Sequence, residues 1–303
     1  MTELFIKDED LTSLKGKTII VTGGSSGIGL ASVNLFLSLG ASVVNGDIKP
    51  PPPPAKDNDT STSFRWLRTD VTVWTDLVAL FKTALELGNG SRRVDHVYAN
   101  AGVSPRAAYL DMEEARVDEA TGDPLEPSHA TYDVNLRGVI NTTALALYYM
   151  RRQDPVGGSV VLGCSIGAMQ RFRAVDYCAS KHGVLGFMRG LRQVLEEAKV
   201  PVRVNATAPS WTQGGMVPEK ILAQLGEPLQ SPAAVARGAA LLMADGARQG
   251  HVLHIARGRY KEVEEAVLLP AYEKDVLYED TNIEDDTLRR VLDALGGVYR
   301  DQV

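Results

Sequence analysis

Tyr177 and Lys181 have the residue types and the spacing of a proton-transfer pair. Residues four apart lie on the same face of a helix, so the lysine ammonium would stand near the tyrosine phenol. A nearby positive charge favours the phenolate, and we therefore expect Lys181 to lower the pKa of Tyr177 from its free value of about 10. A tyrosine tuned in this way can take up or release a proton near neutral pH.

Ser165 adds a hydroxyl to this pair. It lies twelve residues before Tyr177, at the end of an apolar run, residues 158–164, that is typical of a buried strand. A hydroxyl there can hydrogen-bond a substrate oxygen and stabilise the negative charge that develops on it. Together the three side chains predict proton transfer at a substrate oxygen.

A glycine-rich turn near the N-terminus indicates a dinucleotide site. It lies between a β-branched strand candidate, residues 17–21, and a helix candidate, residues 30–39, and it reads Thr22-Gly23-Gly24-Ser25-Ser26-Gly27-Ile28-Gly29. Its glycines allow a tight turn and the close approach of a pyrophosphate. The N-terminus of the following helix offers free amides and a favourable dipole to the phosphates.

Asp47 bears on the choice of cofactor, because it ends the second strand candidate, residues 41–47. A carboxylate there accepts hydrogen bonds from both ribose hydroxyls of NAD and repels the 2′-phosphate of NADP. Lys49 lies close by and can weaken this preference. The sequence favours NAD over NADP, and the alternative interpretation of Asp47 is a solvated turn residue.

The chain resembles the short-chain dehydrogenase/reductase family over roughly residues 15–270. The resemblance rests on the glycine loop, Asn100-Ala101-Gly102, Ser165 and the Tyr177–Lys181 pair, in this order. It implies that the triplet at 100–102 stabilises the sheet centre and lines the cofactor cleft, that Asp70 and Val71 meet the adenine ring, and that Lys181 binds the nicotinamide ribose.

The resemblance also implies that Asn135 is a fourth catalytic residue, which holds a water between Lys181 and solvent. The alternative for Asn135 is a capped or solvent-facing amide. Pro209, Trp211 and Thr212 match the family segment that contacts the nicotinamide. That segment departs from the family pattern, since Ser210 replaces a glycine and Gly214 stands at the usual position of a threonine.

These motifs require a fold that brings the ends of several strands together. Strand candidates at 17–21, 41–47, 64–71, 95–99, 158–165, 201–209 and 250–255 alternate with helical segments, among them 131–150 and 175–198. The pattern and the resemblance predict an α/β fold: a single Rossmann-type domain with a doubly wound, parallel seven-stranded sheet and helices on both faces. The cofactor would lie across the carboxyl ends of the strands.

The chain divides into three parts: a loose polar lead-in, residues 1–16; the NAD(P)-binding domain, residues 17–256; and a C-terminal extension, residues 257–303. Apolar residues at 288, 291, 292 and 295 have helical spacing, so we expect a helical extension that packs on the body or across a dimer interface. The tail is most similar to fungal enzymes that resemble 15-hydroxyprostaglandin dehydrogenase. Residues 50–54 are consecutive prolines of an expected loop, and residues 213–230 predict a substrate lid.

Composition argues against several classes of function. The 303-residue chain has a net charge of -6 and no basic block, which argues against a nucleic-acid partner. The apolar runs are too short to span a bilayer and the N-terminus shows no signal region, so we expect a soluble, cytoplasmic protein. Cys164 and Cys178 lack metal-ligand spacing, which predicts neither a metal site nor a disulfide scaffold.

The sequence therefore predicts an NAD(P)-dependent oxidoreductase that interconverts a secondary alcohol and a ketone, and the family resemblance implies a homodimer or homotetramer. A fairly apolar specialised metabolite is the expected small-molecule substrate, from the apolar candidates Leu110, Met169, Phe172, Trp211 and Met216. One alternative is a non-redox cyclase or isomerase on the same scaffold. The altered segment at 209–212 favours this alternative, whereas the intact proton-transfer set, which consists of Asn135, Ser165, Tyr177 and Lys181, argues against it. The other is a scaffold protein that keeps NAD as a structural ligand.

Overall fold

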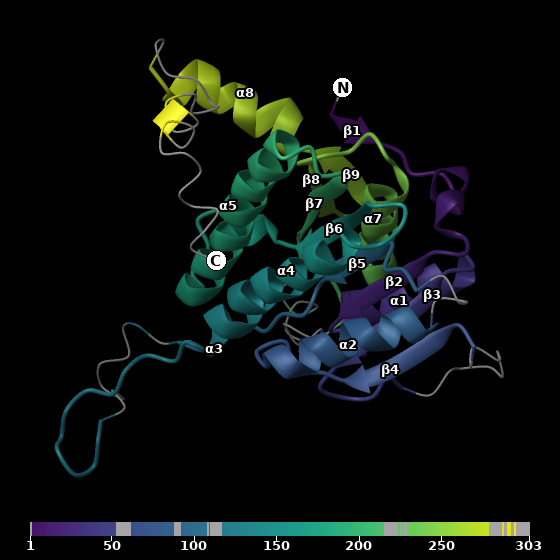
Figure 1. Cartoon of the computed structure of the whole chain (residues 1–303). Coiled ribbons are helices and arrows are strands. Elements are labelled where there is room, and N and C mark those ends of the chain that lie inside the picture. Colours follow the sequence, from purple (N-terminus) through teal and green to yellow (C-terminus); the bar gives the residue numbers. More distant parts are fainter. Residues whose placement is uncertain are drawn as a thin grey trace.

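The computed structural model describes residues 2–52, 62–87, 92–107, 109, 117–214, 224, 226 and 229–278, together with 287, 290, 291 and 294. Figure 1 shows the described elements as a sheet wrapped by helices. The predicted proline loop and substrate lid fall partly outside these residues, and the apolar repeat at 288–295 falls mostly outside them.

The described residues form a nine-stranded sheet in the order β1-β9-β8-β7-β6-β5-β2-β3-β4. Seven of these strands pair in parallel, as predicted. They are β2 (Thr18–Thr22), β3 (Ser42–Asp47), β4 (Phe64–Arg68), β5 (His96–Ala99), β6 (Gly158–Gly163), β7 (Val202–Pro209) and β8 (Val252–Ala256). The central strand β2 is buried at every position, which explains its unbroken β-branched character.

Two antiparallel strands extend the sheet beyond β8. Strand β9 (Arg259–Glu262) pairs with β8, and β1 (Glu3–Leu4) pairs with β9. Between β1 and β2, the 3₁₀ helix η1 (Glu9–Leu14) buries Leu11 and Leu14 completely and packs on helix α7 (Pro232–Ala244). The expectation of a loose lead-in is thus corrected, because the buried leucines and the pairing of β1 with β9 anchor this segment.

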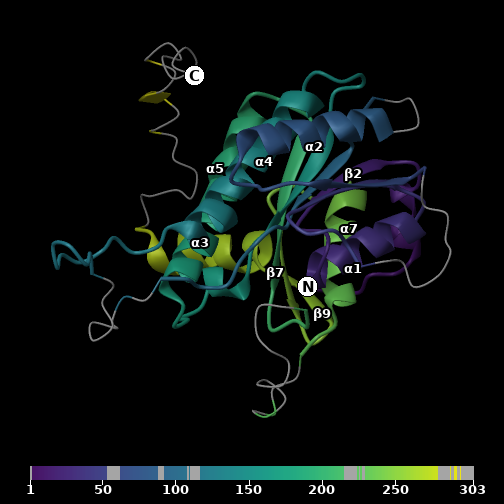
Figure 2. The ribbon, with the colours of Figure 1, turned by 90° about the horizontal axis from the view of Figure 1, so that it is seen from below.

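Helices cover both faces of the sheet, as Figure 2 shows. Helices α1 (Gly27–Ser38) and α7 pack together on one face, and α2 (Trp74–Leu87), α4 (Gly138–Met150) and α5 (Val175–Glu197) cover the other. Each face buries its own apolar cluster. Helix α7 begins as expected, because the Ser231 hydroxyl accepts a hydrogen bond from the Ala233 N–H and Pro232 occupies the first position.

The helical segment predicted at 131–150 is continuous but not uniform. Helix α3 (Ala130–Tyr132) passes into the π-helical turn η3 (Asp133–Arg137) and then into α4. Asn135 lies in the π-helical turn, and its side chain is fully buried. Such turns occur frequently at functional sites, since they re-aim side chains within a helix.

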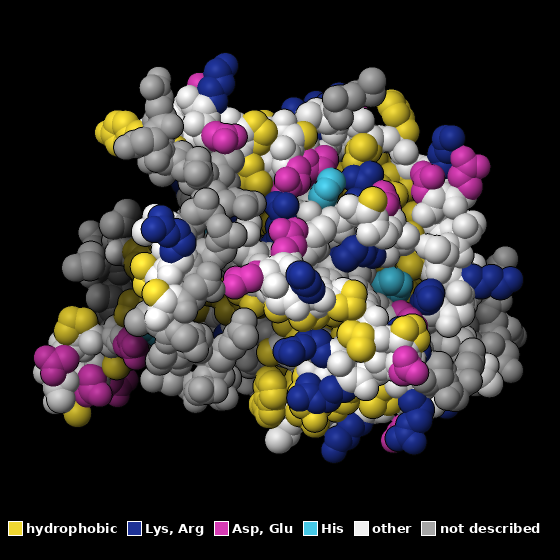
Figure 3. All heavy atoms as spheres, turned by 45° about the horizontal axis from the view of Figure 1, so that its top comes forward, with side chains coloured by type: hydrophobic (Ala, Val, Ile, Leu, Met, Phe, Trp, Pro, Cys, Tyr) yellow, Lys and Arg dark blue, Asp and Glu magenta, His cyan; other side chains and the backbone are white. Residues whose placement is uncertain are grey.

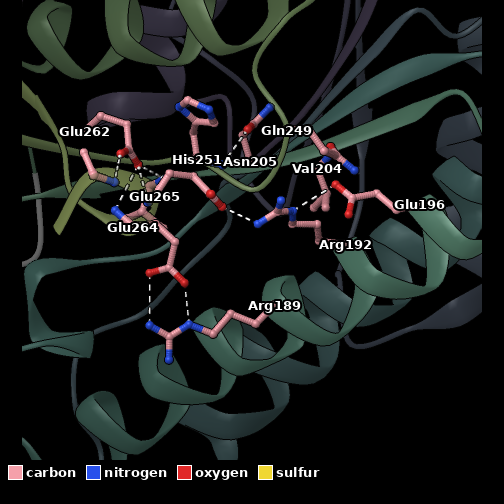
Figure 4. Close-up of polar contacts among 12 residues, drawn as sticks. Arg189, Arg192, Glu196, Val204, Asn205, Gln249, His251, Glu262, Glu264 and Glu265 are labelled. Carbon is pink, nitrogen blue, oxygen red and sulfur yellow. Dashed lines mark hydrogen bonds and ion pairs between the residues drawn. The ribbon is translucent and has the colours of Figure 1, made fainter. Parts of the chain in front are cut away.

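The chain after β9 folds back onto α5. It forms η5 (Glu264–Leu268), α8 (Leu269–Ala271) and η6 (Tyr272–Val276). Figure 4 shows two ion pairs that attach this segment, Arg189 with Glu264 and Arg192 with Glu265. The predicted C-terminal extension thus begins with a strand of the sheet, β9, and the helical turns at 264–276 that follow pack on the body of the same chain.

Charged side chains of both signs are interspersed on the face drawn in Figure 3. This mixture agrees with the absence of a basic block in the sequence. Among the described residues, we find no helix that combines the length and apolar character needed to cross a membrane.

Candidate active site

The carboxyl ends of the central strands open into a cleft of about 770 Å³. It lies at the point where the strand order reverses around β2, which is where ligands bind in doubly wound sheets. Most of the predicted site residues line it: Gly23, Ser26, Gly27, Ile28, Gly29, Asp47, Asp70, Val71, Asn100, Ala101, Gly102, Ser165, Tyr177, Lys181, Pro209, Trp211 and Thr212. Among the described site residues, Thr22, Ser25 and Asn135 do not line the cleft but form hydrogen bonds with residues that do.

The glycine loop leaves no room for a side chain at Gly23 or Gly29. Gly23 has a φ of +70°, and a Cβ there would lie 2.8 Å from the Cα of Ala101. A Cβ on Gly29 would lie 2.0 Å from the carbonyl oxygen of Gly23. At these two positions only backbone fits, at the N-terminus of α1, and this cradle fits the pyrophosphate of a dinucleotide.

Thr22 and Asn100 hold this cradle against the end of β5. The Thr22 hydroxyl accepts hydrogen bonds from the Asn100 N–H at 3.1 Å and the Ala101 N–H at 3.2 Å. The Asn100 amide donates to the carbonyl oxygens of Thr22 and Gly23, at 3.2 and 3.3 Å. The triplet at 100–102 thus ties two central strands together beside the cleft.

Asp47 stands at the carboxyl end of β3 with its carboxylate fixed by backbone amides. One oxygen accepts a hydrogen bond from the Ser25 N–H and the other from the Lys49 N–H, both at 3.0 Å. The Ser25 hydroxyl donates to the Lys49 carbonyl oxygen at 2.7 Å. Asp47 and Lys49 both line the cleft.

Ser165, Tyr177 and Lys181 converge on the same cleft, and all three are buried. The Ser165 hydroxyl accepts a hydrogen bond from the Gly167 N–H, which begins the short 3₁₀ helix η4 (Ile166–Ala168). The Nζ atom of Lys181 lies 5.7 Å from the centre of the Tyr177 ring and donates to the Gly163 carbonyl oxygen at 2.7 Å. A hydroxyl, a phenol and an ammonium therefore face one space.

The pKa of Tyr177 departs from the sequence-based expectation. Burial raises this pKa above its ordinary value of 10.0, and a hydrogen bond with Ser165 lowers it in part. Burial also lowers the pKa of Lys181 to about 8. The expectation that Lys181 lowers the pKa of Tyr177 is corrected, because desolvation dominates at the phenol and the ammonium is directed at Gly163.

Asn135 binds the chain that follows the triplet at 100–102. Its Oδ1 accepts a hydrogen bond from the Val103 N–H at 2.7 Å, and its Nδ2 donates to the Val103 carbonyl oxygen at 3.0 Å and to the Ser180 hydroxyl at 3.3 Å. These contacts and its complete burial exclude a solvent-facing amide.

The segment after β7 turns back on itself and reaches the glycine loop. The Thr212 hydroxyl donates to the Ser210 carbonyl oxygen at 2.8 Å and accepts from the Gln230 amide at 3.0 Å. Gly214 has a φ of +111°, and a Cβ there would lie 2.5 Å from the Cα of Gly27. The close approach of the two loops explains why this chain carries glycine where the family has threonine.

The apolar candidates that the sequence suggested for the substrate pocket line the cleft in part. Phe172 and Trp211 line the cleft with their ring centres 5.6 Å apart. Met169 packs against the apolar core instead, and Leu110 and Met216 lie outside the described residues. No group of acidic, histidine or cysteine side chains that could hold a metal occurs within the described ranges.

Asp176 is a buried site residue that the sequence analysis did not identify. It precedes Tyr177, and its carboxylate accepts hydrogen bonds from Arg106, Ala107, Thr131 and Tyr177. An acidic residue in the first turn of a helix is favourable anyway, so its presence in the sequence gave no signal of these longer-range contacts.

The fold and the cleft define a dinucleotide-dependent enzyme of the doubly wound class. A protein-family model described as short chain dehydrogenase matches residues 17–224, which is more than half of the chain. The chain belongs to the short-chain dehydrogenase/reductase family and is an oxidoreductase that acts on alcohol or carbonyl groups. Members of this family bind NAD or NADP and act on small molecules.

Curated relatives cover most of the chain. The short-chain dehydrogenase/reductase ascJ of Acremonium egyptiacum is 51% identical over 98% of this chain and 97% of its own length. The 5′-hydroxyaverantin dehydrogenase stcG of Emericella nidulans is 34% identical over 66% of this chain and 68% of its own. An NADP-dependent dehydrogenase of a Phoma species is 31% identical over 59% of this chain and 55% of its own.

Solved structures show the same fold. The crystal structure of a short-chain type dehydrogenase/reductase from Mycobacterium marinum matches 82% of this chain and 98% of its own with a TM-score of 0.66. The sequence identity is 24%, so the likeness concerns the fold alone.

Proposed function

We propose that the protein interconverts a secondary alcohol and a ketone, with Tyr177 as the general acid–base and NAD as the preferred cofactor. The observation that carries this proposal is the convergence of Ser165, Tyr177 and Lys181 on the cleft that contains the glycine cradle. When bound, the cofactor supplies the hydride acceptor or donor at its nicotinamide ring, and the protein supplies placement and charge.

Each proton-transfer residue has a proposed role. Tyr177 removes the hydroxyl proton of the alcohol and returns it during ketone reduction. Ser165 orients the substrate oxygen and stabilises its developing charge. Lys181 places a positive charge near the phenol and holds the ribose next to the nicotinamide, and Asn135 maintains the water path between Lys181 and solvent.

Asp47 supports NAD over NADP. Each of its oxygens accepts one backbone N–H and keeps lone pairs for the ribose hydroxyls, and its charge would repel a 2′-phosphate. Lys49 and the NADP-dependent relative support the opposite preference. The glycine cradle accepts the pyrophosphate of either cofactor.

A fairly apolar specialised metabolite is the proposed substrate. Phe172 and Trp211 provide aromatic surface at the cleft, and a relative is named for the secondary-metabolite alcohol 5′-hydroxyaverantin. The finer resemblance to 15-hydroxyprostaglandin dehydrogenase-like enzymes, the homodimer or homotetramer and the cytoplasmic location stay predictions. A cyclase or isomerase is not favoured, because such a reaction would not need the intact proton-transfer set.

A cofactor titration tests the proposal directly. NADH and NADPH are titrated separately while the fluorescence of Trp66, Trp74 and Trp211 is followed, and secondary alcohols are then screened with the tighter-binding form. We expect tighter NADH binding, and we expect Asp47→Ala to weaken NADH more than NADPH. Tighter NADPH binding to the unmodified protein would overturn the cofactor preference, and binding of neither would overturn the redox function.

A further inference from the structure

We propose that Asp176 is a positioning residue whose carboxylate holds residues 103–107 against the start of α5, the catalytic helix that carries Tyr177 and Lys181. This segment would thereby be fixed as the substrate-side wall of the cleft, next to Tyr177. The kinetic consequence rests on the proposed alcohol–ketone reaction, whereas the anchoring itself does not.

One carboxylate joins three separate parts of the chain. Asp176 is fully buried in the first turn of α5. Its Oδ2 accepts hydrogen bonds from the Arg106 N–H at 2.8 Å, the Ala107 N–H at 3.1 Å and the Thr131 hydroxyl at 2.6 Å. Its Oδ1 accepts the Tyr177 N–H at 2.9 Å. Asp176 therefore links the wall, helix α3 and the catalytic helix.

The charge of Asp176 strengthens these contacts. Burial raises the pKa of Asp176, but the hydrogen bonds donated by Arg106, Thr131, Ala107 and Tyr177 outweigh burial and hold this pKa below its ordinary value. The carboxylate is therefore ionised near neutral pH, and hydrogen bonds to an ionised acceptor are shorter and stronger than neutral ones. Its place at a helix N-terminus adds a favourable dipole interaction.

The anchored segment is part of the cleft and has no helix or strand to stiffen it. Residues 103–106 line the cleft, and residues 101–107 are irregular chain that continues from β5. Asn135 holds the first residue of the segment, Val103, through two hydrogen bonds. Asp176 holds the last two. The wall is thus tied at both ends to the elements that carry the proton-transfer residues.

Loosening the wall would remove its contacts with a bulky substrate but leave the glycine cradle, which Thr22 and Asn100 hold through hydrogen bonds of their own. Contacts between the wall and a bulky substrate form in the ground state as well as in the transition state, so their loss raises KM more than it lowers kcat. We expect the loss to appear mainly as a raised KM for bulky alcohols that reach the wall, and to be small for compact ones such as propan-2-ol.

Thr131→Val tests this with little change of shape, because it removes the hydroxyl donor to Asp176. Thr131→Ser keeps the donor and should restore the kinetics. The matched control is Thr143→Val, which also deletes a buried threonine hydroxyl but one that bonds the Val139 carbonyl oxygen within α4. Asp176→Asn is the stronger variant, because an amide replaces one acceptor oxygen by a donor.

We expect Thr131→Val and Asp176→Asn to raise KM for bulky alcohols about tenfold or more, with kcat changed less and NADH affinity kept within about twofold. Thr131→Ser and Thr143→Val should match the unmodified enzyme. Equal KM in Thr131→Val, Thr143→Val and the unmodified enzyme would overturn the proposal, as would a parallel loss of NADH affinity in Asp176→Asn.

Amide hydrogen exchange tests the anchor without turnover. The amides of Arg106 and Ala107 should exchange slowly in the unmodified protein and faster in Thr131→Val and Asp176→Asn, but not in Thr143→Val. Fast exchange of both amides in the unmodified protein would overturn the anchor. Slow exchange in a protein that turns over no alcohol would overturn the proposed reaction and leave the anchor supported.

Discussion

Tyr177 is the residue on which the proposed chemistry depends. Its phenol is buried beside Ser165 and within reach of the charge of Lys181. Tyr177→Phe keeps the ring and its packing but removes the group that exchanges the proton. We expect turnover to fall by about 10²–10⁴-fold, the usual contribution of general acid–base catalysis, with NADH affinity unchanged in the fluorescence titration. Full activity of this variant would contradict the assigned role.

The raised pKa of Tyr177 predicts a pH dependence. The phenolate is the base for alcohol oxidation, and a pKa above 10.0 keeps it scarce at neutral pH. Initial-rate kcat/KM for oxidation should therefore rise with pH, by up to about tenfold per unit below that pKa. Ketone reduction needs the protonated phenol. Its kcat/KM should therefore be independent of pH below that pKa and fall above it. Because Lys181 loses its charge near pH 8, the decisive window lies below it: a rate of oxidation that declines from pH 6 to about 7.5 would contradict this prediction.

At the scale of elements, the cleft depends on two loops that meet backbone to backbone. Gly214→Ala places a Cβ 2.5 Å from the Cα of Gly27, and Gly214 also has a positive φ. We expect the loops to separate and NADH affinity to fall about tenfold or more, measured by the same titration. Gly122→Ala is the control, because Gly122 has a φ of +74° with open space around it. Equal affinity in both variants would refute the close approach.

At the scale of the whole molecule, the chain after β9 is held to α5 by a buried charge. Glu264 is 1% exposed and pairs with Arg189 through two hydrogen bonds. Glu264→Gln should lower the free energy of unfolding by about 2 kcal/mol, because it weakens a charged pair at a buried site. The measurement is urea unfolding followed by circular dichroism.

The control for that variant is Glu196→Gln, which weakens a more exposed pair with Arg192 on the same helix. Exposed ion pairs contribute about 0–1 kcal/mol, so this change should have a small effect. If the two variants unfold at the same urea concentration, the C-terminal segment does not depend on its buried pair.

The sequence by itself determined the family, the parallel sheet and most of the cleft. Strand and helix periodicity and the spacing of Tyr177 and Lys181 are local properties, so they can be recognised in the sequence. The fold then brings the predicted residues together because the carboxyl ends of parallel strands meet at one edge.

The tertiary structure alone decided what depends on distant contacts. The two antiparallel strands, the ordered N-terminal segment and the raised pKa of Tyr177 follow from pairing and burial that no local pattern encodes. The Asp176 carboxylate bonds a backbone amide 70 positions away. Gly214 lies against Gly27. Such contacts are set by how the packed elements approach one another, and one-dimensional spacing carries no information on that approach.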